Sequence, residues 1–373
     1  MQLINHNNIF KIIKSKKISL KNINKKRALK LYFFMLKLRL IEEALSEEYH
    51  PADEMRCPVH FCAGQEAVPA ALNNLLENKD YLFSHHRSHG YYLAKNAPLR
   101  KLFAEIYGKE TGANSGIAGS QDISYPKNNF YSGAILAGAV SIAIGTAMAL
   151  QMNKKNNRIV VAGFGEAAAD EGVFWESINY AGLKKLPIIF VCENNNYSVF
   201  SPQSKRLGGV GISERAKIFG VNSKSIFGNN ISLVHSELKK AILNARKNKG
   251  PFLLEAFTYR YNGHVGPLSD DLVGYRSEKE ISFWKKNCPI TLFEKALIKK
   301  KYLNKNDIKI MKKKINNEIN DSFQYAKKSN FPSLSSWEDM NFSNKSPVAD
   351  KILKDLEKKD FDESQKIIQV KGY

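Results

Sequence analysis

The stretch that decides the fold is RIVVAGFGEAAADEGVFWESINYAGLKKLPIIFVCENNNYSVFS, residues 158–201. The apolar runs 159–162 and 187–191 are short and rich in β-branched residues, as expected for strands that are buried on both faces. Between them, apolar residues recur at helical spacing from Val173 to Leu183. The stretch therefore predicts one βαβ unit, in which a ligand would lie beyond the carboxyl ends of the strands.

Both predicted strands end in polar groups. Gly163 and Gly165 close the first strand, where they would allow close backbone approach or a positive φ, and Glu166 follows them. The second strand ends in Glu193 and the asparagines 194–196. Carboxylate and amide oxygens at neighbouring strand ends are suitable ligands for a Mg²⁺ ion that also binds a phosphate group. The amino terminus of the helix that follows the first strand also favours a phosphate. The alternative is a plain glycine turn and an asparagine-rich loop.

The run GEAAADEG, followed by ENNNYS after the second strand, resembles the thiamine-diphosphate signature. The family with the most similar pattern is the alpha subunits of the thiamine-diphosphate-dependent 2-oxo acid dehydrogenases. This resemblance implies an α/β fold with a central, mostly parallel sheet flanked by helices on both faces. It also implies thiamine diphosphate and Mg²⁺ as cofactors. By position, the metal ligands would be Glu166, Asn195 and the backbone carbonyl of Tyr197, and Gly165, Ala167 and Ala168 would border the cofactor.

Two residues of the signature depart from the family pattern. Glu166 stands where the family has Asp, and Ala167 stands where it has Gly. Because octahedral Mg²⁺ is strict about distance, the longer Glu166 side chain puts ordinary metal binding in question. Asp170 could substitute as a ligand, but it lies at a helix start, where we expect it to cap the helix.

Two further segments match the family's cofactor-binding loops. In FSHHRSHGYYL, residues 83–93, the family places an Arg on the cofactor diphosphate, which here is Arg87. His86 stands where the family often has Tyr and would border the cofactor, whereas His89 is expected to be structural. In YRYNGH, residues 259–264, His264 matches the family's His at the cofactor and the reacting centre, where a neutral imidazole could act as donor or acid.

Two other segments bear on catalysis and its control. Where the family has Ser-Met-His, this chain has Ser120, Gln121 and Asp122, so a histidine usually found near the reacting carbon is missing. Val265 replaces a serine that regulated members phosphorylate, which excludes that form of control at this position.

Residues 128–152 carry no charge, and the run is long enough for a membrane-spanning helix. Glycine, alanine and serine dominate it, and it leads directly into the βαβ unit. We therefore expect a tightly packed internal helix and no membrane association. The resemblance places backbone groups at Ala134 and Leu136 against the pyrimidine end of the cofactor.

Composition sets limits on function. The 373 residues, 43% of them apolar, can bury a large core, and the four cysteines without regular spacing indicate a reducing environment. Cys57, His60 and Cys62 lie close together, but no second ligand pair follows, which disfavours zinc there. The net charge of +21 comes mostly from lysine and lacks the motif context of nucleic-acid binding, so we expect no nucleic-acid partner.

The sequence predicts three regions. Residues 1–30 form a basic arm without acidic residues, residues 31–330 the diphosphate- and metal-binding domain, and residues 331–373 a C-terminal tail. An amphipathic helix is expected over residues 31–49. The arm lacks both the apolar core of a signal peptide and the Arg- and Ser-rich composition of a transit peptide, which predicts a cytoplasmic protein.

The resemblance implies a reaction and its partners. The family decarboxylates a 2-oxo acid and passes the acyl group to a lipoyl group on an acyltransferase component. Its beta subunit supplies the rest of the active site, so this chain would be active only in a two-alpha, two-beta heterotetramer. Two alternatives remain open: a catalytically impaired or structural paralogue, suggested by Glu166, Ala167 and the lost histidine, or a thiamine-dependent decarboxylase or aldehyde transferase that does not use lipoate.

Overall fold

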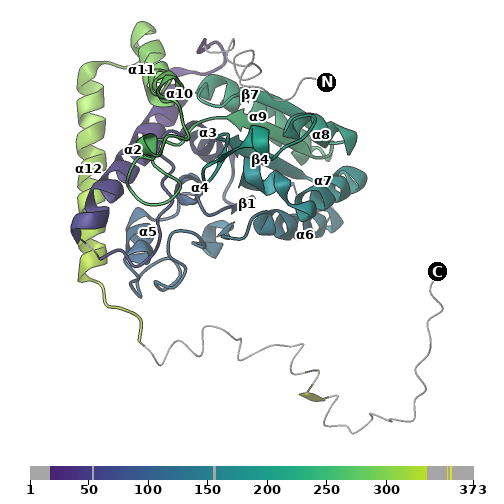
Figure 1. Cartoon of the computed structure of the whole chain (residues 1–373), viewed down its shortest axis with the longest axis horizontal. Helices are drawn as coiled ribbons and strands as arrows, with labels where there is room; N and C mark the ends of the chain where they lie inside the picture. Colours follow the sequence, from purple (N-terminus) through teal and green to yellow (C-terminus); the bar gives the residue numbers. More distant parts are fainter. Residues whose placement is uncertain (1–16, 53, 154–156, 334–350, 352, 355–373) are drawn as a thin grey trace, which may run out of the picture. The chain divides into compact units, whose positions relative to one another are not determined.

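The computed structural model describes residues 17–52, 54–153, 157–333, 351 and 353–354. The chain divides into two units, Met1–Phe331 and Pro332–Tyr373. The fold described below is that of the first unit (Figure 1).

A six-stranded sheet forms the centre, with the strand order β2-β1-β3-β4-β8-β7. Every pair of neighbouring strands in it is parallel, which confirms the predicted sheet type. Two further short strands pair antiparallel next to the carboxyl end of β4. The strands are β1 (Tyr81–Ser84), β2 (Phe130–Ser132), β3 (Val160–Gly165), β4 (Ile188–Asn194), β5 (Tyr197–Ser198), β6 (Ser201–Pro202), β7 (Asn222–Phe227) and β8 (Phe252–Phe257).

Helices surround the sheet and carry the labels of Figure 1. The α-helices are α2 (Lys25–Ala52), α3 (Ala67–Leu75), α4 (His89–Ala94), α5 (Leu99–Ile106), α6 (Gly138–Met152), α7 (Gly172–Lys184), α8 (Ile212–Ile218), α9 (Ile231–Arg246), α10 (Glu278–Lys286), α11 (Pro289–Lys299) and α12 (Lys305–Lys328). Short 3₁₀ turns are η2 (Pro126–Asn128), η3 (Glu166–Asp170), η4 (Gln203–Lys205) and η5 (Asp271–Val273).

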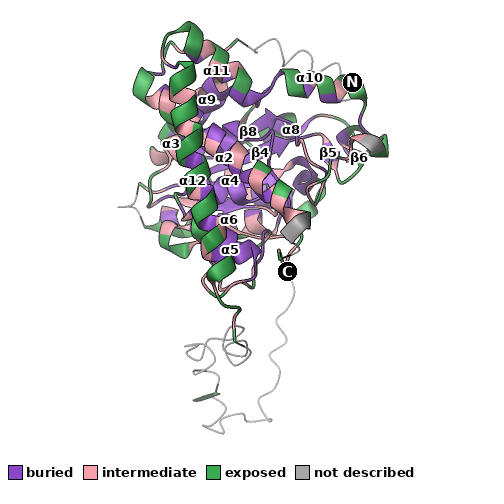
Figure 2. Ribbon diagram, turned by 90° about the vertical axis from the view of Figure 1, so that its left-hand side faces the viewer, coloured by how far each residue is buried: buried purple, intermediate pink, exposed green. Residues whose placement is uncertain are grey.

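Alternate residues of the strands enter two separate cores, because successive side chains of a strand point to opposite faces. Val161 and Ile189 join a core with residues of α2, α3, α9 and α12. Val160 and Ile188 join the other core with residues of α6, α7 and α8. Figure 2 shows the resulting buried centre between helices whose outer sides are exposed. The sheet is therefore covered on both faces, as predicted.

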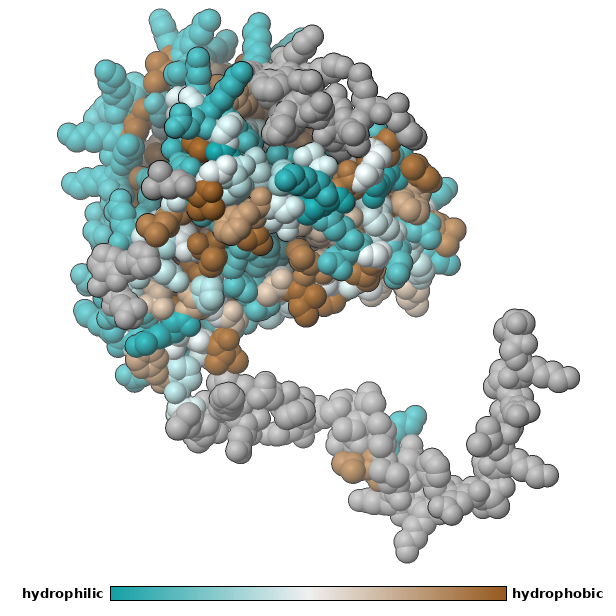
Figure 3. Space-filling view, viewed as in Figure 1, coloured by the Kyte–Doolittle hydropathy of each residue, from teal (hydrophilic) through white to brown (hydrophobic). Residues whose placement is uncertain are grey.

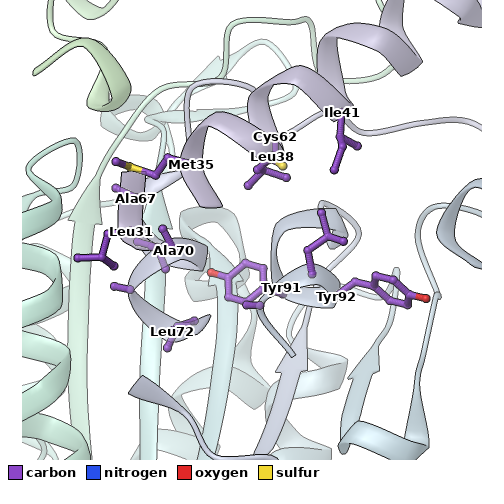
Figure 4. Packing of buried hydrophobic residues seen from close by; sticks show 14 of the residues in the cluster. Leu31, Met35, Leu38, Ile41, Cys62, Ala67, Ala70, Leu72, Tyr91 and Tyr92 are labelled. Carbon is purple, nitrogen blue, oxygen red and sulfur yellow. The ribbon is translucent and has the colours of Figure 1, made fainter. Parts of the chain in front are cut away.

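Helix α2 anchors the first core. Its residues Leu31, Met35, Leu38 and Ile41 are fully buried and face α3 and the aromatic rings of α4 (Figure 4). Their spacing of three and four residues places them on one side of the helix. Helix α12 covers the outer side of this first core, and its many lysines make that surface strongly hydrophilic (Figure 3).

The βαβ prediction is confirmed, since β3, η3, α7 and β4 follow one another across residues 160–194. The helix predicted over residues 31–49 is present but begins at Lys25, inside the segment assigned to the basic arm. The described part of that segment is thus partly helical, and the division into arm, domain and tail stays a prediction.

The uncharged run forms β2 and α6, but the prediction of an internal helix is wrong. Ile142 is 64% exposed and Met152 is 74% exposed, and both lie on the outer side of α6. Only one side of α6 packs on the sheet, so the other is an apolar surface. Among the described residues, no helix is both long and apolar enough to span a membrane.

Candidate active site

A cavity of about 300 Å³ lies at the carboxyl ends of β3 and β4, as the βαβ unit predicts. Seven separate segments of the chain contribute to its walls, which explains why no single motif defines it. The lining residues are His60, His85, His86, Arg87, Gln121, Ala134, Ile135, Leu136, Ala137, Ala139, Val140, Gly163, Phe164, Gly165, Glu166, Ala167, Ala168, Asn195, Tyr197, Ser198, Val199 and His264.

All eleven residues named from the sequence line this one cavity. They are His86, Arg87, Ala134, Leu136, Gly165, Glu166, Ala167, Ala168, Asn195, Tyr197 and His264. The structure thus brings together residues up to 178 positions apart in the chain, from His86 to His264. Their individual roles with the cofactor and the metal stay predictions.

The two glycines at the end of β3 serve different purposes. Neither has a positive φ, so that part of the prediction is wrong. A Cβ at Gly163 would lie 2.6 Å from the ring of Tyr91, so close packing requires glycine there. A Cβ at Gly165 would meet nothing within 4 Å, because Gly165 faces the cavity. Gly163 therefore serves packing, and Gly165 leaves room for a ligand.

Glu166 is paired with an arginine of its own chain. Its Oε1 accepts a hydrogen bond from Nη2 of Arg206 at 2.6 Å, and only 2% of the Glu166 side chain is exposed. Nη1 of the same guanidinium pairs with Asp170. Burial raises the pKa of Glu166, and the charge of Arg206 opposes that rise. The carboxylate is thus already partly neutralised within the chain.

This pairing also corrects the role predicted for Asp170. The residue belongs to the 3₁₀ turn η3, and α7 begins at Gly172 with Glu171 at its N-cap position and no side-chain capping bond. Asp170 pairs with Arg206 instead. A local helix-start pattern cannot reveal a partner that lies 36 residues further along the chain.

The polar end of β4 is held by hydrogen bonds of its asparagine side chains. Oδ1 of Asn195 accepts from the backbone N–H of Tyr197 at 3.1 Å, and Nδ2 of Asn194 donates to Oε1 of Glu255 on β8 at 2.8 Å. Val199 has a φ of +50°, which is strained for a β-branched residue. Its carbonyl accepts from Nη2 of Arg260 at 2.7 Å, which holds the strained turn in place.

Arg87 and a group of histidines form the opposite wall. Nη1 of Arg87 donates to the carbonyl of Phe61 at 2.5 Å, and Nη2 donates to that of His264 at 3.2 Å. Burial, and secondarily the charge of Arg87, lowers the pKa of His264 to about 4 and that of His85 to about 3. The imidazoles are therefore neutral near pH 7. A neutral imidazole at His264 is the form that was predicted, and it can donate or accept a hydrogen bond; its catalytic role stays a prediction.

The loop that carries His264 is organised by Asp270. One Asp270 oxygen, Oδ2, accepts from the backbone N–H of His264 at 3.1 Å, from Arg260 at 3.2 Å and from the Tyr275 hydroxyl at 2.7 Å. These bonds depress the pKa of Asp270 although partial burial opposes this. The Asp270 carboxylate thus fixes His264 at the edge of the cavity.

His89 has the structural role that was predicted. It is fully buried, with Nδ1 2.7 Å from Glu42 and Nε2 2.8 Å from the Ser120 hydroxyl. Glu42 also accepts from the backbone N–H of Cys62 at 2.6 Å. These bonds tie α2 to the loops on either side of the cavity.

Sequence reasoning missed several residues of the site. Arg206 directly follows the 3₁₀ turn η4, in a segment to which the sequence assigned no role, and no local pattern marks it. His60 was weighed only as a zinc ligand with Cys57 and Cys62, whereas the structure places it in the cavity wall. Glu193, whose Oε1 is buried without a hydrogen-bond partner, lies directly before the asparagines, and burial raises its pKa to about 7.

The residues present fit thiamine diphosphate. A buried cationic Arg87 faces a cavity with open space at Gly165, and neutral imidazoles line the far end. The fit to Mg²⁺ is conditional. Glu166 and Asn195 both line the cavity with oxygen ligands, but a metal ion would have to share Glu166 with Arg206.

Comparison with known proteins agrees with this picture. The family model of the dehydrogenase E1 component matches residues 34–335. The pyruvate dehydrogenase E1 component subunit alpha of Porphyra purpurea is 32% identical over 321 residues, which is 84% of this chain and 92% of that protein. Its counterpart from Rhizobium meliloti is 30% identical and covers 84% of this chain and 89% of its own length. A mitochondrial form from Macaca fascicularis is 30% identical over 82% of this chain and 76% of its own. The chain therefore belongs to the dehydrogenase E1 component family, as an alpha subunit of the thiamine-diphosphate-dependent 2-oxo acid dehydrogenase type.

Proposed function

We propose that this chain binds the diphosphate end of thiamine diphosphate, with Mg²⁺, in an enzyme that decarboxylates a 2-oxo acid and passes the acyl group to a lipoyl carrier. The observation that carries the proposal is the convergence of Arg87, Glu166, Asn195 and His264 on one cavity at the carboxyl ends of two parallel strands. Pyruvate, which the relatives' names specify, is the first substrate to test.

The division of labour follows from the geometry. When bound, thiamine diphosphate supplies the nucleophilic carbon and the electron sink for the loss of CO₂. Arg87 provides a buried positive charge for the diphosphate, and Gly165 leaves the space that the diphosphate needs. Glu166, Asn195 and the carbonyl of Tyr197 would hold Mg²⁺.

His264 acts at the other end of the cavity. Because its pKa is about 4, the imidazole stays neutral at pH 7 and serves as a hydrogen-bond donor or acceptor to the substrate. Gln121, which replaces the family's histidine, also lines the cavity and offers an amide. Neither side chain exchanges a proton readily at neutral pH, so a proton donor is expected from the partner chain or from water.

We also propose a beta subunit as partner in a two-alpha, two-beta heterotetramer, with a lipoyl acyltransferase as the acceptor component. The support is the surface next to the cavity. Ile135 and Leu136 line the cavity yet are exposed, and the outer side of α6 continues this apolar area with Ile142 and Met148. A second chain laid over this area would bury it and close the cavity. The cytoplasmic location also remains a proposal, based on composition alone.

The test is a titration of the full-length chain, co-purified with its beta subunit, with thiamine diphosphate in Mg²⁺ and again in a chelator. We expect saturable binding that Arg87→Gln weakens by about 10–100-fold, because a charge-assisted contact is lost. Arg100→Gln is the matched control, since Arg100 lies on α5 and stacks on Tyr325. Absence of binding to the intact complex would refute the proposal.

One observation favours a second candidate, an impaired paralogue that keeps the fold and the partner. Arg206 already binds the Glu166 carboxylate, which Mg²⁺ would need as a ligand. If the complex assembles but binds neither Mg²⁺ nor the coenzyme, that function replaces the first.

A further inference from the structure

Three histidines of the cavity wall lie within reach of one ion. His60, His86 and His264 come from three separate segments, and their candidate ligand atoms all lie within 4.8 Å of one another. The ring centroids are 4.7 Å apart for His60 and His86, and 5.0 Å apart for His60 and His264. His60 is buried, and the other two are half-buried where they face the cavity.

We propose that His60, His86 and His264 form a binding site for a divalent transition-metal ion of the Zn²⁺ class. Imidazole nitrogen suits Zn²⁺, Co²⁺ and Ni²⁺, whereas Mg²⁺ prefers the carboxylate and amide oxygens at Glu166 and Asn195. The histidine site is thus chemically distinct from the predicted magnesium site in the same cavity.

The geometry needs only a small adjustment. Nitrogen atoms that are at most 4.8 Å apart lie within about 2.8 Å of a common centre, whereas a Zn–N bond is about 2.0–2.1 Å long. Each ring must therefore move by less than about 1 Å. Three protein ligands leave a fourth position, which here opens into the cavity and can hold water or a ligand oxygen.

The surroundings support the ligands. Nε2 of Gln121 lies 3.3 Å from Nδ1 of His60. Rotation of this amide by half a turn would let its oxygen accept from Nδ1–H, which leaves Nε2 of His60 free for the ion.

Arg87 opposes the ion, since its guanidinium is buried beside the histidines and donates to the carbonyl of His264. The charge of Arg260 is countered by its pair with Asp270, whereas Arg87 donates to the carbonyl oxygens of Phe61 and His264. We therefore expect binding in the micromolar range, weaker than a closed structural zinc site.

The test uses metal ions alone, so its outcome does not depend on the coenzyme. The full-length, untagged chain, co-purified with its beta subunit, is stripped with a chelator and titrated with Co²⁺, and binding is followed by the visible absorption that tetrahedral Co²⁺ shows. Zn²⁺ affinity is then measured by calorimetry. We expect one ion per chain, and at least about a tenfold loss of affinity in His86→Tyr and in His264→Gln.

Two controls make the result specific. His235→Gln removes a histidine that binds Asn74 outside the cavity, and Glu166→Gln removes the predicted magnesium ligand. Both should keep the Co²⁺ spectrum, and thermal melting should show that every variant is folded. The proposal would be overturned if the wild type showed no saturable binding, or if both His86→Tyr and His264→Gln kept the Co²⁺ spectrum. Loss of the spectrum in either control would also overturn it.

Discussion

Replacing Arg206 by glutamine tests how the chain controls its predicted magnesium site. Arg206 lies 2.6 Å from Oε1 of Glu166 and also pairs with Asp170. The substitution removes a positive charge next to the carboxylate that Mg²⁺ would bind, while the shorter amide can still donate a hydrogen bond. We therefore expect Arg206→Gln to bind Mg²⁺ more tightly than the wild type.

The magnitude follows from the distance. The 2.6 Å contact, a metal–oxygen bond of about 2.1 Å and a guanidinium C–N bond of about 1.3 Å place the ion no more than about 6 Å from the centre of the charge, if both use Oε1. At that separation, repulsion between +1 and +2 charges is about 1.4 kcal/mol even with the dielectric constant of water. Loss of Arg206 should therefore lower the Mg²⁺ dissociation constant by about tenfold or more. Without Mg²⁺, the variant should be about 1–3 kcal/mol less stable, because Glu166 is left buried without its cation.

The assay is a calorimetric Mg²⁺ titration of the alpha–beta complex with saturating thiamine diphosphate. Lys205→Gln is the matched control, since it removes the same charge from the exposed neighbouring residue. Thermal melting with and without Mg²⁺ measures the stability effect. Unchanged or weaker Mg²⁺ binding in Arg206→Gln, with Lys205→Gln equal to the wild type, would refute the idea that Arg206 competes with the metal.

Three further predictions concern packing, pH and a loop. Gly163→Ala should lower the melting temperature by several degrees, because its Cβ would lie 2.6 Å from the Tyr91 ring, while Gly165→Ala should leave it almost unchanged. Melting temperature should fall from pH 7 to pH 5, because buried histidines with pKa values near 3 to 4 take up protons in the unfolded state below about pH 6.5, at up to about 2 kcal/mol each. Glu193, with a pKa of about 7, has the opposite sign, because its stabilisation is lost as pH rises from about 4.5 to 7, and burial raises the pKa of Glu43, Glu166 and Glu255 in the same direction. We expect the four histidines, which lose stabilisation over this whole pH interval, to outweigh these carboxyl groups. Glu105→Ala should lower the free energy of unfolding by about 3 kcal/mol, because the Glu105 carboxylate accepts hydrogen bonds from four backbone N–H groups of the loop 114–119. Chemical denaturation measures this change, and equal stability of variant and wild type would contradict the prediction.

The central layer of the fold could be predicted from sequence because its signals are local. Runs such as 159–162 and 187–191 are apolar throughout, and the helix between them repeats with helical spacing. The boundary at Lys25 could not be predicted, because nine basic residues in the first thirty look like a solvated arm, whereas α2 is stabilised by its buried side chains further on.

The candidate site could be predicted only where motifs name it. The signature and the loops at Arg87 and His264 mark cavity-lining residues, and the structure brings them together. The partner of Glu166 could not be found in this way, because an ion pair between residues 40 apart depends on how the loop after β6 returns to β3. The neutral imidazole expected at His264 agrees with the structure, but its cause could not be predicted, since burial and the nearby Arg87, and not the residue type, lower its pKa.

The apolar outer side of α6 has a consequence for how the protein is made. Ile142, Met148 and Met152, together with Leu183 on the adjacent α7, face water in the single chain. Copies synthesised in excess of the chain that covers this surface would aggregate through it. Balanced production of this chain and its companion is therefore a condition for recovering it in soluble form. Yield in the supernatant, with and without simultaneous synthesis of the companion chain, would then report on the surface before any enzymatic turnover is measured.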